Sequence, residues 1–227
     1  MKLSVIIPVY NEEKTLRTII DKVLKVQIDK ELIIVDDFSN DNSRLIIKEY
    51  SASQNIKAVY HEKNYGKGRA IRSGIECVTG DIVIIQDADL EYEPEDYPKL
   101  IAPITEGRAN VVYGSRELGT THQHSYFSFY IGGKFLSWLT NILYGSHITD
   151  ESTCYKVFTT DVLKSIRLNC VRFEFCPEVT AKILKRGHKI VEVPIHYYPR
   201  KKREGKKIRW KDGIEAIWAL MRYKFSD

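Results

Sequence analysis

The sequence contains few cysteines, and none of them is spaced like a metal ligand. The four cysteines of the 227-residue chain are Cys77, Cys154, Cys170 and Cys176. No two of them form a C-x-x-C pair, which argues against a zinc site and against a disulfide framework. No stretch near the first residue resembles a signal peptide. We therefore expect a cytoplasmic protein without disulfide bonds.

A long uninterrupted apolar run is also missing. The most apolar stretch, residues 126–145, is broken by polar residues and glycines, so it does not supply the roughly 20 apolar residues of a spanning helix. Its spacing predicts an amphipathic helix with a wide apolar face. That face fits either the protein core or a helix that lies in a membrane interface or lines an acceptor site. Any membrane contact should therefore be peripheral, at the cytoplasmic face.

No internal repeat or low-complexity linker divides the chain, and short apolar runs alternate with helical patterns. The expected strands are 3–9, 32–35, 57–60, 82–85, 110–113 and 189–193. The expected helices begin after residue 13 and then cover 43–51, 67–78, 94–105, 126–144, 176–185 and 211–223. Strands separated by helices predict an α/β class, with a Rossmann-like, mostly parallel, doubly wound sheet and helices on both faces. We expect a single domain, 1–227.

Positive charge is concentrated near the end of the chain. The net charge is only +5, but residues 200–211 contain eight Lys or Arg and one Glu. Such a segment fits a solvated surface, a nucleic-acid patch, an anionic-membrane patch or a clamp on substrate phosphates. A nucleic-acid site would need aromatic residues among the basic ones, and only Trp210 is present. We expect no nucleic-acid partner.

Two carboxylates follow the apolar run 82–85. Asp87 and Asp89 stand in the D-x-D spacing, at the sheet edge where open α/β sheets bind ligands. Magnesium and manganese are commonly held by one or two carboxylates together with substrate phosphates. The alternative is that both Asp residues only cap a turn. If the first interpretation holds, the substrate is a phosphorylated donor.

The first two strands end in polar residues that should reach the same edge. Tyr10 could stack on a base, Glu12 could accept hydrogen bonds from ribose hydroxyls, and Asp37 could accept one from a base N–H. Each could also be a turn or cap residue. The G-x-G-x-x-G motif of dinucleotide sites is absent after the first strand. A mononucleotide pocket is the better expectation.

Five segments in order resemble family-2 glycosyltransferases of the GT-A fold. They are SVIIPVYNEE (4–13), IIVDDFSNDNS (33–43), NYGKGRAIRSG (64–74), DADLEYEPED (87–96) and YGSR (113–116). The segments TDESTCYKVF (149–158), 173–200 and EGKKIRWKDG (204–213) are similar to the dolichol-phosphate mannose synthase group. That group moves a sugar from a nucleotide donor to a polyprenyl phosphate. The resemblance implies a nucleotide-sugar half, 1–116, and an acceptor half, 117–227, with amphipathic helices and a basic lid.

The resemblance also implies roles for individual residues. The nucleotide-sugar pocket would comprise Pro8, Tyr10, Glu12, Val35, Asp37, Lys67, Asp87 and Ala88. The Mg²⁺ or Mn²⁺ ligands would be Asp87, Asp89 and Glu91. The diphosphate or acceptor would be bound by Arg116, Arg200, Arg203 and Lys207.

The implied reaction is an inverting displacement that depends on Asp89 and Arg116, with GDP-mannose or UDP-glucose as the type of donor. A lipid phosphate would need little general-base help. A soluble or cell-envelope saccharide acceptor is the alternative, with Asp150 as the base, although Asp150 could equally be a structural cap. Between Arg116 and Lys134 the only basic side chains are His122 and His124, where the mannose synthases carry a second arginine. A third and remote possibility is a nucleotide-sugar-binding protein without turnover.

Overall fold

One sheet collects strands from both halves of the chain. The structure is a computed structural model that describes residues 1–53, 55–119, 127–200 and 210–226. The strands are β1 (Leu3–Val9), β2 (Lys30–Asp36), β3 (Ile56–Tyr60), β4 (Ile82–Ile85), β5 (Val111–Ser115), β6 (Lys156–Thr159) and β7 (Val191–Pro194). The helices are α1 (Leu16–Lys25), α2 (Ser43–Tyr50), α3 (Lys67–Glu76), the short 3₁₀ helix η1 (Pro94–Asp96), α4 (Tyr97–Thr105), α5 (Phe127–Tyr144), α6 (Thr160–Ser165), α7 (Phe175–Lys185) and α8 (Trp210–Phe225).

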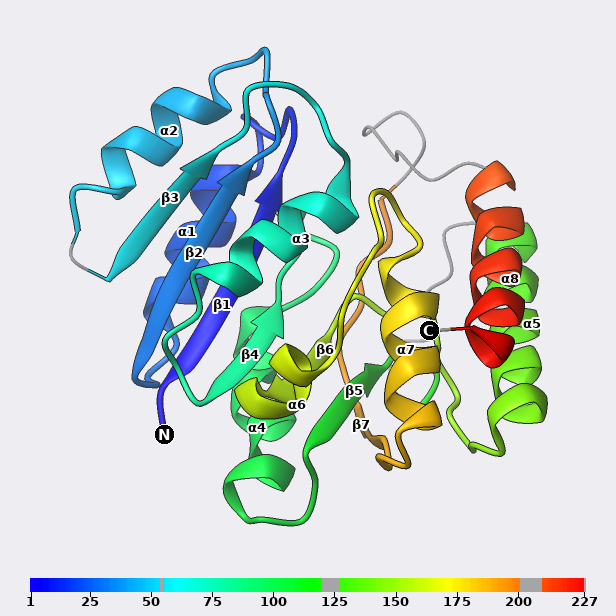
Figure 1. The fold of residues 1–227 in the computed structure, drawn as a ribbon. Coiled ribbons are helices and arrows are strands. Elements are labelled where there is room, and N and C mark those ends of the chain that lie inside the picture. The colour runs from blue at the N-terminus through cyan, green and yellow to red at the C-terminus, as the bar shows by residue number, and fades with distance from the viewer. Residues whose placement is uncertain (54, 120–126, 201–209, 227) are drawn as a thin grey trace.

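The strand order is β3-β2-β1-β4-β6-β5-β7, and β6 alone runs antiparallel to its two neighbours. Helices α3, α6 and α7 lie on the face nearer the viewer in Figure 1, and α1 lies behind the sheet. The mostly parallel, doubly wound α/β sheet predicted from the sequence is confirmed. The sequence analysis missed β6, whose four residues begin with Lys156. A lysine does not suggest a strand interior, yet Lys156 is fully buried here.

The core lies around β1, β2 and β4, whose apolar side chains are almost fully buried. Strands covered on both faces read as continuous apolar runs, which is why these three could be recognised. Helix α1 covers them with Leu16, Ile19, Ile20 and Val23. The carboxyl ends of β1, β2 and β4 therefore meet at one edge of a rigid platform.

Helices α5 and α8 lie side by side next to α7, far from β3 (Figure 1). A small core of Ala181, Ala219, Leu220 and Tyr223 joins α7 to α8, and the Tyr144 hydroxyl donates to the Leu220 carbonyl at 2.7 Å. Each of α5 and α8 thus buries one face and leaves the other exposed. In the described part of the chain no helix is long and apolar enough to span a bilayer.

Candidate active site

Acidic side chains gather where β1 and β4 end. Glu12 follows β1, and Asp87, Asp89 and Glu91 follow β4, which pairs directly with β1. We call these four carboxylates the acidic cluster. The turn after β1 includes Asn11 with a φ of 51°, and the turn after β2 includes Phe38 with a φ of 65°. A residue other than glycine in the left-handed region costs conformational free energy, and such residues often occur at functional sites. The backbone of both turns is therefore consistent with a functional role.

Two basic side chains neutralise part of the acidic cluster. The Lys67 ammonium lies 2.5 Å from an Asp87 oxygen, and Arg200 Nη2 lies 2.6 Å from an Asp89 oxygen. Arg200 Nη1 also contacts Glu12 at 3.2 Å. Burial would raise the pKa of Asp87, but Lys67 outweighs burial and lowers it. Burial, followed by the charges of Asp87 and Glu91, raises the pKa of Asp89 to about 7. The cluster therefore carries more negative charge than its two cations balance.

Glu91 anchors the segment that carries Arg200. Its Oε1 accepts a hydrogen bond from the Arg200 backbone N–H at 2.9 Å, and its Oε2 accepts one from the Tyr197 hydroxyl at 3.0 Å. Among the described residues, no three His, Cys, Asp or Glu side chains are arranged to hold a metal ion. The structure thus brings Asp87 and Asp89 together but does not assemble the predicted three-ligand set with Glu91. Arg203 and Lys207, the other predicted lid residues, lie outside the described residues.

Arg116, at the end of β5, is held by Asp150. Its Nε and Nη2 each lie 2.7 Å from a different oxygen of that carboxylate, and its backbone N–H donates to the same group at 3.0 Å. Nη2 also donates to Ser152 at 2.9 Å, and the guanidinium lies 5.0 Å from the centre of the Tyr197 ring. Burial would raise the pKa of Asp150, but Arg116 lowers it. This geometry favours a positioning role for Asp150 over the predicted base, and it leaves Nη1 of Arg116 as a donor for an anion.

Asp37 is committed to the loop before α3. Its carboxylate is 2% exposed and accepts the backbone N–H groups of Tyr65 and Gly66 at 2.9 and 2.7 Å. It also lies 2.7 Å from His61 Nδ1, whose Nε2 lies 2.9 Å from the Ser73 hydroxyl. Gly66 has a φ of 93°, and a Cβ there would approach the Val171 carbonyl to 2.5 Å, so only glycine fits. Asp37 therefore fixes the loop from which Lys67 reaches Asp87.

The remaining predicted pocket residues lie at the same edge with different exposure. Pro8 and Val35 are register partners on β1 and β2, and Val35 is fully buried in the core. Ala88 is 4% exposed, and Tyr10 is half-buried. Val35 thus has a packing role in this structure. Sequence reasoning missed His61 and Ser73, although His61 lies three residues before Asn64, the first residue of the NYGKG loop, which was a usable signal.

A family model for "Glycosyl transferase family 2" matches residues 4–167, which is most of the chain. The chain belongs to glycosyl transferase family 2. This confirms the family that the five sequence motifs indicated, and with it the prediction of a glycosyltransferase.

Similar solved structures include three of glucosyl-3-phosphoglycerate synthase from Mycobacterium tuberculosis, each 18% identical to this chain. The complex with uridine diphosphate has a TM-score of 0.75 and covers 99% of this chain and 79% of the other. The complex with Mn²⁺, UDP-glucose and phosphoglyceric acid has a TM-score of 0.75, with coverage of 99% and 80%. The complex with Mg²⁺ and uridine diphosphate has a TM-score of 0.72, with coverage of 99% and 79%. At this identity the likeness shows a shared fold.

Proposed function

We propose that this glycosyltransferase moves a hexose from a nucleotide sugar to a polyprenyl phosphate, with inversion and with a divalent cation. The observation that carries the acceptor assignment is an exposed surface. All three tryptophans of the chain, Trp138, Trp210 and Trp218, are 56–71% exposed on α5 and α8. Such a surface suits an acceptor that carries an apolar chain.

We call this surface the α5–α8 apolar face. It consists of Ile131, Phe135, Trp138, Ile142, Trp210, Ile214, Trp218, Met221 and Phe225, each at least 39% exposed. The spacing places the members on the side of each helix opposite its buried residues. Contiguous apolar patches on soluble proteins commonly mark an interaction surface, and tryptophan is enriched at membrane interfaces. The exposed lysines 211 and 224 add positive charge on α8, whereas Lys134 on α5 is paired with Glu117.

The apolar face is connected to the acceptor end of the site through the buried side of α5. The Ser137 hydroxyl accepts the backbone N–H of Glu151 at 2.9 Å. Gly133 packs beside Ser152, which bonds Arg116. Helix α5 therefore lies between the apolar face and the residues that hold Arg116, and a lipid bound at the face would have to reach past α5 to present its phosphate there. The phosphate would meet Nη1, because Nε and Nη2 already donate to Asp150 and Ser152, and the permanent charge of the guanidinium suits an anion.

The donor set fits a divalent cation. Asp87 and Asp89 supply hard oxygen ligands, and the raised pKa of Asp89 reflects a shortage of positive charge in the acidic cluster. These two residues would hold Mg²⁺ or Mn²⁺, and Arg200 would have to leave Asp89. When bound, the cation would neutralise charge on the departing nucleoside diphosphate. The M. tuberculosis structures that contain Mn²⁺ or Mg²⁺ with uridine diphosphate support this assignment and a UDP-sugar as the first donor to test.

In the reaction, an oxygen lone pair of the acceptor phosphate forms a bond to the anomeric carbon. The bond from that carbon to the diphosphate oxygen breaks, and its electron pair leaves with the nucleoside diphosphate. No proton has to be removed from an ionised phosphate, so no general base is required. The work of this chain is to orient the two anionic groups and to stabilise the charge that moves between them, through Lys67 and Arg116.

A small phosphorylated acceptor is the second candidate. The similar structure with UDP-glucose contains phosphoglyceric acid, which also offers charged oxygens. Both acceptors would use Arg116, but only the lipid would use the α5–α8 apolar face. The face is thus the feature that separates the two candidates.

The test is transfer from a panel of GDP- and UDP-sugars with Mn²⁺ or Mg²⁺. The acceptors are undecaprenyl phosphate in vesicles, a water-soluble short-chain polyprenyl phosphate, and phosphoglyceric acid. We expect both polyprenyl phosphates to be glycosylated, and W138S/W218S to raise KM for the vesicle acceptor alone. Leu45→Ser is the matched control, because Leu45 is 58% exposed on α2. Glycosylation of phosphoglyceric acid without that of either lipid would overturn the acceptor assignment.

A further inference from the structure

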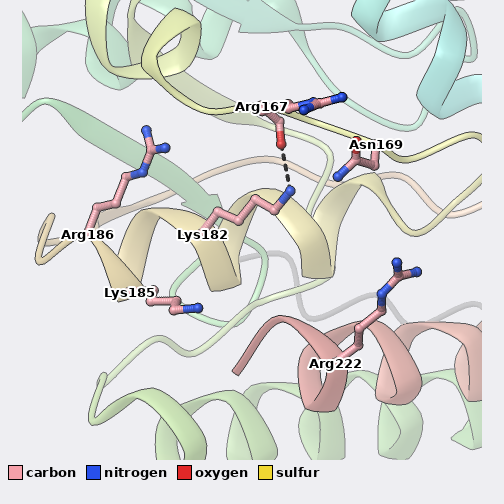
Figure 2. A pocket seen from close by; sticks show the side chains of 6 residues that line it. All are labelled: Arg167, Asn169, Lys182, Lys185, Arg186 and Arg222. Atoms are coloured by element: carbon pink, nitrogen blue, oxygen red, sulfur yellow. Dashed lines mark hydrogen bonds between the residues drawn. The ribbon is translucent and has the colours of Figure 1, made fainter. Parts of the chain in front are cut away.

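A basic cavity lies between α7, α8 and the segment that follows α6 (Figure 2). Its volume is about 400 Å³, and it is lined by Arg167, Asn169, Lys182, Lys185, Arg186 and Arg222. Five of the six side chains are cationic, and none is acidic. The volume falls in the range of small-molecule sites, roughly 300–1,000 Å³.

The cavity is separate from the acidic cluster. Its α7 residues lie in the last turns of that helix, whereas the segment before α7 contacts Gly66 beside Lys67. No residue that lines the cavity belongs to the acidic cluster, although Asn169 of the lining lies two residues before Val171, whose carbonyl faces Gly66. An anion in the cavity would not be the donor diphosphate in its pocket.

Three of the cations have structural partners. Lys182 is 6% exposed, and its ammonium donates to Glu178 at 2.7 Å and to the Arg167 carbonyl at 2.6 Å. Arg186 donates to the backbone and hydroxyl oxygens of Ser165, and Lys185 donates to the Ser226 carbonyl at 3.2 Å. Cations near helix C-termini commonly bind free carbonyl groups in this way. These hydrogen bonds give Lys182, Lys185 and Arg186 structural roles that need no ligand.

The other two cations, Arg167 and Arg222, have no comparable structural partners among the described residues. Within the described part of the chain neither guanidinium has an ion pair or a hydrogen bond, and Arg222 only lies 5.6 Å from the centre of the Tyr223 ring. In Figure 2 Arg222 extends from α8 toward the segment that carries Asn169. Two exposed guanidinium groups on one cavity repel each other and the three neighbouring cations. An anion bound in the cavity would reduce this repulsion.

We infer that the basic cavity is a second ligand site, for a molecule that bears a phosphate group. Arg167 and Arg222 would be its charged contacts, because the guanidinium fork matches two phosphate oxygens. Asn169 would add a neutral hydrogen bond, and Lys182, already fixed by Glu178, would form the rigid floor. The phosphate could belong to a free metabolite or to a lipid headgroup, since Arg222 directly follows Met221 of the α5–α8 apolar face.

The test is a calorimetric titration with inorganic pyrophosphate in metal-free, low-salt buffer. We expect R167Q/R222Q to bind pyrophosphate at least tenfold more weakly than the unmodified protein. R17Q/R108Q is the matched control, because it removes two exposed arginines elsewhere and the same charge. An R167K/R222K variant keeps the charge, so its affinity for pyrophosphate should lie between that of the unmodified protein and that of R167Q/R222Q. This variant also guards against a folding defect in R167Q/R222Q. Equal affinities for R167Q/R222Q and R17Q/R108Q, without the vesicle effect described next, would overturn the inference.

Vesicles distinguish the two sources of phosphate. Binding to phosphatidylcholine vesicles is compared with binding to vesicles that also contain phosphatidic acid. If phosphatidic acid strengthens vesicle binding of the unmodified protein but not of R167Q/R222Q, the ligand is a lipid headgroup. If R167Q/R222Q loses only its binding of pyrophosphate, the ligand is a free phosphate compound. If neither ligand depends on the two arginines, the site does not exist. Glycosyl transfer to the soluble short-chain acceptor should be unchanged in R167Q/R222Q, so this result leaves the proposed function untouched.

Discussion

Replacing Asp150 by asparagine separates a positioning role from a base role. In the structure both Asp150 oxygens receive N–H groups of Arg116, with three contacts of 2.7–3.0 Å. An amide keeps the shape but has one acceptor oxygen, and its NH₂ group would face a guanidinium N–H. Arg116 would then be a partly buried cation without its counter-charge. We expect it to turn away from the position in which it can meet a phosphate.

The size of the effect follows from burial. The side chains of Arg116 and Asp150 are 22% and 4% exposed. Removing one partner of a buried ion pair costs about 3–5 kcal/mol, and the partial exposure of Arg116 together with the remaining acceptor places D150N near the lower end, about 3 kcal/mol. For a chain of this length that corresponds to a Tm lower by roughly 6–12 °C. Because Arg116 holds the pKa of Asp150 low, the pair stabilises the fold above the unfolded pKa of about 4 and is lost as the pH falls.

The assays are thermal unfolding and transfer to a short-chain polyprenyl phosphate. We expect kcat/KM of D150N to fall about 10- to 100-fold, with a pH profile of unchanged shape. Ser152→Ala is the control, because it removes one hydrogen bond from the same guanidinium and should cost only about 1 kcal/mol. If D150N keeps the Tm of the unmodified protein but loses turnover with hydroxyl acceptors only, Asp150 is a base and the positioning argument is wrong.

Further predictions concern the site and the core beneath it. Asp89→Asn should abolish metal-dependent turnover without lowering the free energy of unfolding at pH 8, since burial and nearby charge raise the pKa of Asp89 to about 7. For the same reason Mn²⁺ affinity of the unmodified protein should rise as the pH increases through 7, and a calorimetric series from pH 5.5 to 8.5 that stays flat would contradict this. Arg200→Gln should bind Mn²⁺ several-fold more tightly in the absence of donor, because no guanidinium competes for Asp89; unchanged affinity in the same titration would count against the competition. His61→Ala should cost about 1–3 kcal/mol in urea unfolding and raise the KM for the donor, because Asp37 loses a buried partner. Glu151→Gln should raise the Tm at pH 8. Burial raises the pKa of Glu151, and both of its carboxylate oxygens lack a hydrogen-bond partner among the described residues, so its charged form destabilises the fold progressively as the pH rises above about 4. A lower Tm of the variant would show that the charge is needed.

The parallel strands could be predicted because their signal is local. Strands β1, β2 and β4 are buried on both faces, so each is a continuous apolar run that stands out between helical patterns. Strand β6 has no such signal, because Lys156 opens it and only three residues follow. In the fold that lysine is satisfied by the Glu151 carbonyl at 2.6 Å and lies 3.6 Å from the centre of the Tyr113 ring. Neither partner can be inferred from spacing.

The contrast between local signals, which a sequence shows, and distant partners, which it does not, applies to the site as well. The rule that parallel strands share a carboxyl edge was enough to predict that Glu12, Asp37 and Asp89 lie at the same edge of the sheet. It could not give their partners, which come from distant segments. Arg200 lies 111 residues beyond Asp89 along the chain, and Asp150 lies 34 residues beyond Arg116. The sequence therefore predicted which carboxylates follow these strands, but not that Asp150 would be held by an arginine.

The two cations of the acidic cluster differ in how firmly they are held, and this difference indicates how the site is filled. Lys67 comes from a loop fixed by Asp37, and burial would lower its pKa, yet Asp87 raises it. Arg200 makes three ion pairs, with Glu12, Asp89 and Glu91, but its buried Nε lies 4.0 Å from the Glu91 oxygen and has no hydrogen-bond partner among the described residues, a defect of about 1–3 kcal/mol. The raised pKa of Asp89 shows that Arg200 alone does not neutralise its side of the cluster. A divalent cation should therefore displace Arg200 and leave Lys67 on Asp87, which frees Arg200 to meet the charge that the donor diphosphate brings.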